Sequence, residues 1–354
     1  MSVADPESPA APDAAPTGAV ARIQSVEIEN LRGIKSGKLE GLAPLTILTG
    51  PNGSGKSTVL DALDIGGSPN PAEAVQDCVN RRPPISGAAR WLLWRGHGGG
   101  ERCRVQCVAT AGEARGCTLT VTEDRAAATW EITVTAALHA ETVRTYQRTF
   151  RHNGMSIERQ HPEVDVALPG VDEVEVVEGV PRTFRNTLSD LYSAIARAGR
   201  RENIAVLASS LVSTVDRVEV LTEGDVPVLH FGWAGGSLPI AYYGEGTHAA
   251  FRIGLSLTAL SGGVALLEEP EAHLHPAAMA LVAKAIVNAV RSGTQVVLTT
   301  HSLEFIDCLL DECEEPDGLL ALFTLWLDDG HLQSVRHDGG EVRFARRQIA
   351  EDLR

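Results

Sequence analysis

The stretch 45–57 reads LTILTGPNGSGKS and contains two structural signals in direct succession. The apolar-rich run at 45–49 predicts a buried strand. After the stretch, VLDALDIGG at 59–67 follows a helical pattern that ends in glycines, so it predicts a helix. Between them, GPNGSGKS at 50–57 fits G-x-x-x-x-G-K-[ST] completely, in the strand-before, helix-after context that this motif requires. The stretch therefore predicts an α/β fold built around a phosphate-binding loop.

The loop has the residue types that phosphate binding needs. Its glycines let backbone N–H groups curl around phosphate oxygens, and the positive end of the following helix points at the same anion. Lys56 is placed to reach the terminal phosphates of ATP, and the Ser57 hydroxyl to ligate Mg²⁺. A chance glycine-rich turn is disfavoured, because lysine occurs only at positions 35, 38, 56 and 284. The predicted ATP contacts here are Gly50, Pro51, Asn52, Gly53, Ser54, Gly55, Lys56, Ser57 and Thr58.

A P-loop needs an acidic partner at the end of a neighbouring buried strand, and VALLEE at 264–269 supplies one. Consecutive strand side chains point to opposite faces, so a regular strand cannot aim both glutamates at one phosphate. The strand is therefore expected to end here, and Pro270 agrees with that ending. We predict that Glu268 contributes to the Mg²⁺ shell and that Glu269 polarises the attacking water.

The same region, LLEEPEAHLHP at 266–276, also raises the alternative of a transition-metal site. A structural zinc site would need four ligands with loop spacing, and no cysteine pair lies nearby. Pro276 suits the first turn of a helix, which places His273 and His275 in a short connector. The nucleotide interpretation is therefore favoured over the metal interpretation.

The stretch TQVVLTTHS at 294–302 places His301 at the end of another predicted buried strand. A histidine there is able to contact the γ-phosphate or the attacking water. The alternative is that His301 and Ser302 only cap the following helix.

Taken together and in this order, the motifs resemble those of ABC-type ATPase heads of the SMC/RecF/OLD group, nearest to bacterial OLD-like "AAA family ATPase" proteins without a nuclease domain. Residues 28–63 look like the N-terminal segment of that group, 266–276 like its Walker B and D-loop, and 299–306 like its H-loop. The resemblance covers about 22–65 and 186–354. It implies an α/β P-loop NTPase fold, with a mixed or parallel sheet core, an antiparallel β subregion and a helical lobe.

Such heads also carry a signature motif that reaches the ATP of a partner subunit. LSGG at 260–263 leaves no room for a helix before the Walker B strand, whereas AYYGEGT at 241–247 precedes a predicted helix of about four turns. We choose 241–247, which puts Tyr242 where the group usually has a serine. Gly244 and Gly246 there allow close backbone approach to a phosphate. A second departure is Glu268 in place of the more usual aspartate.

The division of the chain follows from changes in pattern. We expect a disordered, Ala/Pro-rich tail at 1–20 and one ABC-type domain at 21–354. Within it lie the Walker A core with an antiparallel β region (21–160), a helical lobe with an insertion (161–245), and the signature helix, Walker B, H-loop and C-terminal hairpin (246–354). Arg32 lies either near the nucleotide or at a solvated strand end. The candidates for the Q-loop glutamine are Gln76, Gln147 and Gln160.

Composition restricts location and partners. The net charge of −15 does not favour broad binding to DNA, although local basic patches leave DNA open as a partner. No secretion signal and no apolar run long enough for a bilayer are present, so we expect a cytoplasmic protein that does not bind membranes. The six cysteines contain no CxxC pair and are expected to be reduced and mostly buried.

The leading functional interpretation is a head that binds ATP, hydrolyses it with Mg²⁺ and forms a homodimer around it. It would drive a separate effector protein, in DNA repair or anti-phage defence, since the chain leaves no room for a fused nuclease. One alternative is a non-catalytic ATP-dependent switch or scaffold, which the tyrosine at 242 favours. Another is a transporter subunit, which the position of LSGG and the N-terminal segment disfavour.

Overall fold

We describe the chain from a computed structural model. The structure describes residues 22–353, apart from 83–87, 95, 97–101, 111, 125–128, 139–140, 152–155, 159–170, 172, 180–186 and 261. The predicted tail at 1–20 and the Q-loop candidate Gln160 lie outside the described residues.

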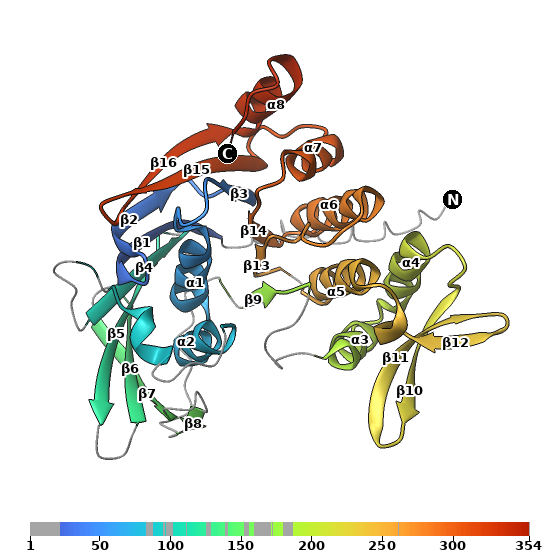
Figure 1. Cartoon of the computed structure of the whole chain (residues 1–354), viewed down its shortest axis with the longest axis horizontal. Coiled ribbons are helices and arrows are strands. Elements are labelled where there is room, and N and C mark those ends of the chain that lie inside the picture. The colour runs from blue at the N-terminus through green and yellow to red at the C-terminus, as the bar shows by residue number, and fades with distance from the viewer. Residues whose placement is uncertain are drawn as a thin grey trace, which may run out of the picture.

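Most strands belong to one large sheet, in the order β8-β7-β6-β5-β4-β1-β2-β16-β15-β3-β14-β13-β9 (Figure 1). Its strands are β1 (Ile23–Leu31), β2 (Ile34–Glu40), β3 (Leu45–Thr49), β4 (Arg102–Ala109), β5 (Ala114–Asp124), β6 (Thr129–Leu138), β7 (Glu141–Arg151), β8 (Ser156–Glu158), β9 (Val174–Val177), β13 (Val264–Glu268), β14 (Gln295–Thr299), β15 (Leu320–Asp328) and β16 (His331–Asp338). A second sheet contains β10 (Arg217–Glu223), β11 (Val226–Trp233) and β12 (Gly236–Pro239).

The helices pack on both faces of the large sheet and beside the small one. They are α1 (Lys56–Gly67), α2 (Pro71–Asn80), α3 (Leu188–Arg197), α4 (Arg201–Leu211), α5 (Glu245–Ala259), α6 (Pro276–Arg291), α7 (Leu303–Glu312) and α8 (Gly339–Gln348), with short 3₁₀ turns η1 (Ala88–Leu92) and η2 (Ile240–Tyr242). None of these described helices is long and apolar enough to cross a membrane.

The centre of the large sheet is parallel, as the alternation of buried strands with helices predicts. Strands β15, β3, β14, β13 and β9 pair in parallel, and all side chains of β3 and β14 are buried. Helix α1 packs on one face of these strands, and α5, α6 and α7 pack on the other. Because the carboxyl ends of parallel strands meet at one edge, this arrangement gathers the residues that follow β3, β13 and β14.

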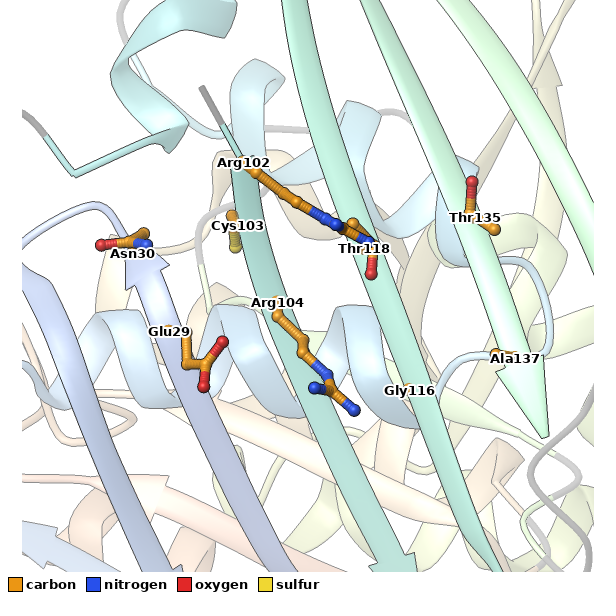
Figure 2. Close-up of a pocket in the computed structure, with 9 residues that line it drawn as sticks. All are labelled: Glu29, Asn30, Arg102, Cys103, Arg104, Gly116, Thr118, Thr135 and Ala137. Atoms are coloured by element: carbon orange, nitrogen blue, oxygen red, sulfur yellow. The ribbon is translucent and has the colours of Figure 1, made fainter. Parts of the chain in front are cut away.

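The period-two pattern between 102 and 152 forms the predicted antiparallel strands, β4 to β7. Their inward side chains include Cys103, Cys107 and Cys117, which are buried as expected for reduced thiols. The outward face is polar and holds a hollow of about 420 Å³ (Figure 2). Arg102 and Arg104 of β4 extend along this hollow, away from the inward face that packs on α1.

Strand β2 was not predicted, because IKSGKLE carries lysines and a glycine and shows no clear apolar face. Its place is set by distant partners. It pairs antiparallel with β1 and, at Ser36, in parallel with His331 of β16, whose ring nitrogen lies 2.7 Å from the Ser36 hydroxyl. A side chain at Gly37 would come within 2.3 Å of Leu332, so glycine is what allows β16 to approach.

The helical lobe combines α3 and α4 with the small antiparallel sheet and one face of α5. Helices α3 and α4 are separated at Gly199, which has φ 74°. Phe231 of β11 makes edge-to-face contacts with Tyr243 and Phe251, at ring distances of 5.0 and 4.8 Å. Strand β12 was not predicted, since GSLP at 236–239 is too short and glycine-rich to give a strand signal.

The predicted C-terminal hairpin is β15 and β16, and the helix that follows it is shorter than the helical pattern EVRFARRQIAEDL at 341–353 suggests. Helix α8 stops at Gln348. The remaining residues fold back, and the carbonyl of Leu353 accepts hydrogen bonds from the hydroxyls of Thr49 (2.7 Å) and Thr324 (2.9 Å). These long-range bonds hold the folded-back segment against β3 and β15.

Candidate nucleotide site

The P-loop has the backbone shape that its glycines were predicted to allow. Gly50, Gly53 and Gly55 have φ values of 131°, 82° and 97°, in the region that favours glycine. At Gly50 a side chain would also lie 2.2 Å from the carbonyl oxygen of Leu325, so the neighbouring strand excludes any larger residue. At Gly53 nothing lies within 4 Å, which leaves the tip of the loop open to a ligand.

Lys56 turns its ammonium back into this loop. The Nζ atom donates hydrogen bonds to the carbonyls of Gly50 (2.8 Å) and Pro51 (3.0 Å). Burial lowers the pKa of Lys56, and the nearby charges of Glu269 and Glu268 oppose that shift. The predicted lysine and the predicted acids, more than 200 residues apart in the chain, therefore lie within electrostatic reach of one another.

The other loop residues divide into an outer and an inner set. Pro51, Asn52 and Gly53 are exposed, whereas the side chains of Ser54 and Thr58 are buried. Ser57 is half-buried in the first turn of α1. Its hydroxyl and the carboxylate of Glu268 are hard oxygen donors of the kind that Mg²⁺ prefers, so these two residues fit the ion when nucleotide phosphates supply further oxygens.

The backbone leaves the strand conformation between the adjacent residues Glu268 and Glu269. Strand β13 ends at Glu268, as predicted, and Glu269 adopts a left-handed conformation with φ 45°. The N–H of Glu269 donates to both the carbonyl and the hydroxyl oxygen of Thr299, each at 3.1 Å. This turn breaks the strand alternation, so the two carboxylates are no longer constrained to opposite faces.

His301 lies directly against Glu269. Its Nε2 atom is 3.4 Å from Oε1 of Glu269, and both side chains are partly exposed. The capping alternative applies to the neighbouring residue, because the Ser302 hydroxyl accepts the N–H of Phe305 (3.1 Å) at the start of α7. The His301 ring is therefore available for contact with Glu269.

The connector after β13 also agrees with the sequence interpretation. His273 and His275 lie between β13 and α6, and Nδ1 of His275 accepts the N–H of Ala277 (3.3 Å) as the helix cap. Among the described residues, no group of three or more His, Cys, Asp or Glu side chains has metal-binding geometry.

The candidate signature segment 241–247 borders this connector. Tyr242 is 78% exposed, and Gly244 caps the 15-residue helix α5 with open space around it. A side chain at Gly246 would lie 3.0 Å from the carbonyl oxygen of His273. Helix α5 packs on the opposite sheet face from α1, and the contact of 241–247 described here is with the connector rather than with the P-loop.

Two acidic residues of this region were not singled out from the sequence. Glu271, in the connector, binds the segment that carries His301 through Thr300. Glu178 follows β9, and the register that pairs Val177 with Leu267 places Glu178 beside Glu268 at the carboxyl edge. The sequence signal that could have identified Glu178 is an acidic residue directly after the short valine-rich strand VEVV.

The two Q-loop candidates that the structure describes do not lie at that edge. Gln76 lies within α2, and Gln147 lies within the antiparallel strand β7. Neither follows the carboxyl end of a parallel strand.

Arg32 is placed by an acidic partner. It lies in the turn between β1 and β2 and forms an ion pair with the buried Asp61 of α1, which also pairs with Arg81 and Arg82. Burial raises the pKa of Asp61, but the three guanidinium groups outweigh it and leave this pKa below its usual value. The sequence predicted Arg32 either near the nucleotide or at a solvated strand end, and neither prediction included this ion pair.

Two protein families match the chain. The family described as "AAA domain, putative AbiEii toxin, Type IV TA system" matches residues 157–307, and another AAA domain family matches residues 25–66. An "ATP/GTP phosphatase" of Helicobacter pylori is 24% identical over 363 residues, which cover 91% of this chain and 97% of that protein. The "Uncharacterized protein MJECL11" of Methanocaldococcus jannaschii is 33% identical over 112 residues, which cover 31% of this chain and 98% of that protein.

Solved structures share the fold at low identity. An Smc head bound to the C-winged helix domain of ScpA has a TM-score of 0.52 and 11% identity, covering 89% of this chain and 98% of its own. An Smc head with an extended coiled coil, bound to the C-terminal domain of ScpA from Pyrococcus furiosus, has a TM-score of 0.53 and 11% identity, covering 94% and 100%. The family matches show that residues 25–66 and 157–307 are similar to AAA domains, and the solved structures show that the chain shares the fold of Smc heads.

Proposed function

We propose that this head binds Mg-ATP at the P-loop and hydrolyses it with Glu269 as the residue that polarises the attacking water. The observation that carries the proposal is the Glu269–His301 pair, 3.4 Å apart, within electrostatic reach of the Lys56 ammonium. A similar protein bearing the name "ATP/GTP phosphatase" supports the same chemistry.

Each residue then has a distinct task. Lys56 and the backbone N–H groups at 50–57 bind the β- and γ-phosphates. Ser57 and Glu268 would hold Mg²⁺, which, when bound, neutralises charge that develops on the phosphate oxygens. Glu269 accepts a proton from the attacking water. His301 orients Glu269 or the water toward the γ-phosphate.

The two glutamates are separated by paired substitutions. Glu269→Gln should bind Mg-ATP normally but hydrolyse it about 10²-fold more slowly or worse, because the amide cannot accept the proton from water. Glu268→Gln should raise the Mg²⁺ concentration needed for half-maximal turnover. Steady-state phosphate release, measured across a Mg²⁺ titration, distinguishes them, with the exposed Glu202→Gln as control. Normal turnover in Glu269→Gln together with an inactive Glu268→Gln would reverse these assignments.

The proposal extends to a homodimer in which 241–247 of each subunit contacts the ATP of the other. The exposed Tyr242 and the open N-terminal end of α5 at Gly244 support it, since they present a helix N-terminus and a hydroxyl on the surface. ATP would hold the subunits together and hydrolysis would release them. The dimer would thereby control a separate effector, in DNA repair or anti-phage defence. The Smc heads of similar fold were solved bound to parts of ScpA.

Dimer formation has a direct test. Glu269→Gln, which retains ATP, should form a more stable dimer with Mg-ATP than with Mg-ADP, as measured by light scattering. A protein that stays monomeric in saturating Mg-ATP would rule out the homodimer and indicate a partner chain instead.

A second candidate is a non-catalytic, ATP-dependent switch. The observation that favours it is Tyr242, which stands where related heads usually have a serine. Such a switch would bind ATP and change its assembly state, but it would show no turnover above that of the Glu269→Gln variant.

A further inference from the structure

We propose that Glu271 is a positioning residue that ties the connector after β13 to the segment carrying His301 and thereby holds His301 against Glu269. The inference rests on the proposed hydrolysis and adds a residue to the machinery at that site.

Glu271 makes its contacts across two segments that are far apart in the chain. Its Oε1 atom accepts the hydroxyl of Thr300 and, at 3.4 Å, the N–H of His301. A single carboxylate oxygen thus binds both residues that immediately follow β14. The contact fixes the backbone from which the His301 ring projects.

Thr300 extends the linkage to helix α7. Its buried hydroxyl donates to Glu271 and accepts the N–H of Ser302 at 3.0 Å, while Ser302 caps α7 through Phe305. Glu271 therefore restrains the whole turn 300–302 and the start of the following helix. The direction of the His301 ring depends on that turn.

The connector itself is rigid enough to transmit this restraint to Glu269. The N–H of Ala272 donates to the carbonyl of Glu269 (2.9 Å), and the N–H of Leu274 donates to the carbonyl of Glu271 (3.0 Å). Left-handed backbone at Glu269 (φ 45°) and His273 (φ 66°) closes two successive tight turns. These turns fix the position of Glu271 relative to the Glu269 backbone. Because Glu271 also binds Thr300, the backbone of Glu269 and the backbone of His301 are held at a constant distance.

The environment of Glu271 fits a structural linkage rather than a solvated surface acid. Its second oxygen, Oε2, is buried and has no hydrogen-bond partner among the described residues. Burial raises the pKa of Glu271, the hydrogen bonds from Thr300 and His301 lower it, and the nearby charge of Glu269 raises it further, with a net increase. The cost of desolvating such a half-buried acid is offset by the hydrogen bonds from Thr300 and His301, which a solvated surface acid would not make.

The test compares substitutions that keep or remove the acceptor. Glu271→Ala should lower kcat for ATP hydrolysis about 10- to 100-fold, the usual range for residues that orient a functional side chain, with KM for ATP nearly unchanged. Glu271→Gln should recover most of the loss, because its amide oxygen still accepts from Thr300 and His301. Thr300→Val should lower kcat about as much as Glu271→Ala does. Thr300→Ser, which keeps the hydroxyl, should have a kcat close to that of the wild type.

A double-mutant comparison shows whether Glu271 acts through His301. If it does, adding Glu271→Ala to a His301→Ala variant should lower kcat by much less than it does in the wild type. Full additivity of the two losses would overturn the inference, as would a normal kcat in Glu271→Ala. A parallel fall in ATP affinity and thermal stability, with no recovery in Glu271→Gln, would also overturn it, since that pattern indicates general disruption.

Failure of the positioning role of Glu271 can be distinguished from failure of the proposed ATP hydrolysis. If wild type turns over ATP and Glu269→Gln does not, but Glu271→Ala is normal, only the positioning role fails. If Glu269→Gln turns over at the wild-type rate, the proposed hydrolysis fails whatever the Glu271 variants do.

Discussion

Lys56 carries a positive charge and is buried in the P-loop. Its ammonium is buried in the P-loop, which lowers its pKa, and it is held by carbonyl oxygens of the loop itself. A buried cation without a counterion is costly, and the nearby Glu268 and Glu269 compensate only part of this cost. A nucleotide phosphate at the loop would add the missing negative charge, so we expect the affinity for ATP to depend strongly on this residue.

Substitution of Lys56 tests that expectation. Lys56→Ala should weaken ATP binding by about 10²-fold or more, since a hydrogen bond to a charged group contributes about 1.5–3 kcal/mol and the ammonium makes several. Lys284→Ala, which removes an exposed lysine from α6, is the matched control and should bind ATP normally. The measurement is titration calorimetry with a non-hydrolysable ATP analogue. Equal affinities of the two variants would contradict the P-loop assignment.

Helix α1 is buried along nearly its whole length, which is unusual for a helix that carries charges. Asp61 and Asp64 pair with Arg81, which follows α2, and Asp61 also pairs with Arg32 and Arg82. At the C-terminal end of α1, the guanidinium of Arg115, from β5, donates to the carbonyls of Ile65 and Gly66. The middle and the C-terminal end of the P-loop helix are therefore fixed by arginines from other elements, which holds the direction of the helix axis toward the phosphate site.

The Asp61 network gives a pH-dependent contribution with a defined sign. The pKa of Asp61 is below its ordinary value of 3.8 in the folded protein, so its stabilisation is present above about pH 3.8 and is lost as pH falls through the lower folded pKa. Asp61→Asn should lower the free energy of unfolding at neutral pH by about 3–5 kcal/mol, because three guanidinium groups lose their buried partner. Below pH 4 the difference between variant and wild type should shrink, by up to about 1.4 kcal/mol per pH unit.

Urea unfolding between pH 2.5 and pH 7 measures this difference. Asp225→Asn, in the exposed turn between β10 and β11, is the control and should follow the wild type at every pH. A constant difference between Asp61→Asn and wild type across this range would show that the charge of Asp61 does not stabilise the fold.

The sheet core gathers the P-loop, Glu269 and His301 at one edge, while α5, which begins within the segment 241–247, packs on the sheet face opposite α1 (Figure 1). The proposed homodimer joins these two regions from different subunits around each ATP. A two-fold axis would create two equivalent composite sites from one chain. Each site would then need the P-loop of one subunit and the signature segment of the other.

Mixed dimers test this arrangement. Lys56→Ala and Gly244→Arg should each be inactive alone, the first for lack of ATP binding and the second because a long cationic side chain blocks the open end of α5. A mixture should recover turnover, since one composite site per heterodimer has both normal parts. The assay is phosphate release against mixing ratio, with light scattering to follow dimers and circular dichroism to verify folding. Folded chains whose mixture is no more active than its components would refute the contribution of 241–247 to the partner's site.

Much of the fold, and the place of the candidate site within it, could be predicted from local sequence. LTILTGPNGSGKS predicted a strand, a loop and a helix start, all of which are present, and the loop glycines adopt the positive φ values that only their lack of a side chain makes easy. The strand end at Glu268 and the helix start at Pro276 were predicted from Pro270 and Pro276 in the same way. The α/β P-loop fold, which the chain shares with Smc heads, is confirmed, whereas the OLD-like resemblance and the roles of individual site residues stay predictions.

Tertiary structure decided the features that depend on partners distant in the chain. Strand β2 has no strand pattern of its own and exists because β1 and β16 both pair with it. The segment after α8 is held by Thr49, some 300 residues away, and the partner of Arg32 is an aspartate on the P-loop helix. Glu271 was an unassigned acid in the sequence, and only the adjacency of β13 and β14 brings it to Thr300 and His301. Backbone preferences and apolar periodicity act over a few residues and can be identified along the chain, whereas ion pairs and hydrogen bonds between elements depend on which strands become neighbours, and that is determined by the folded core.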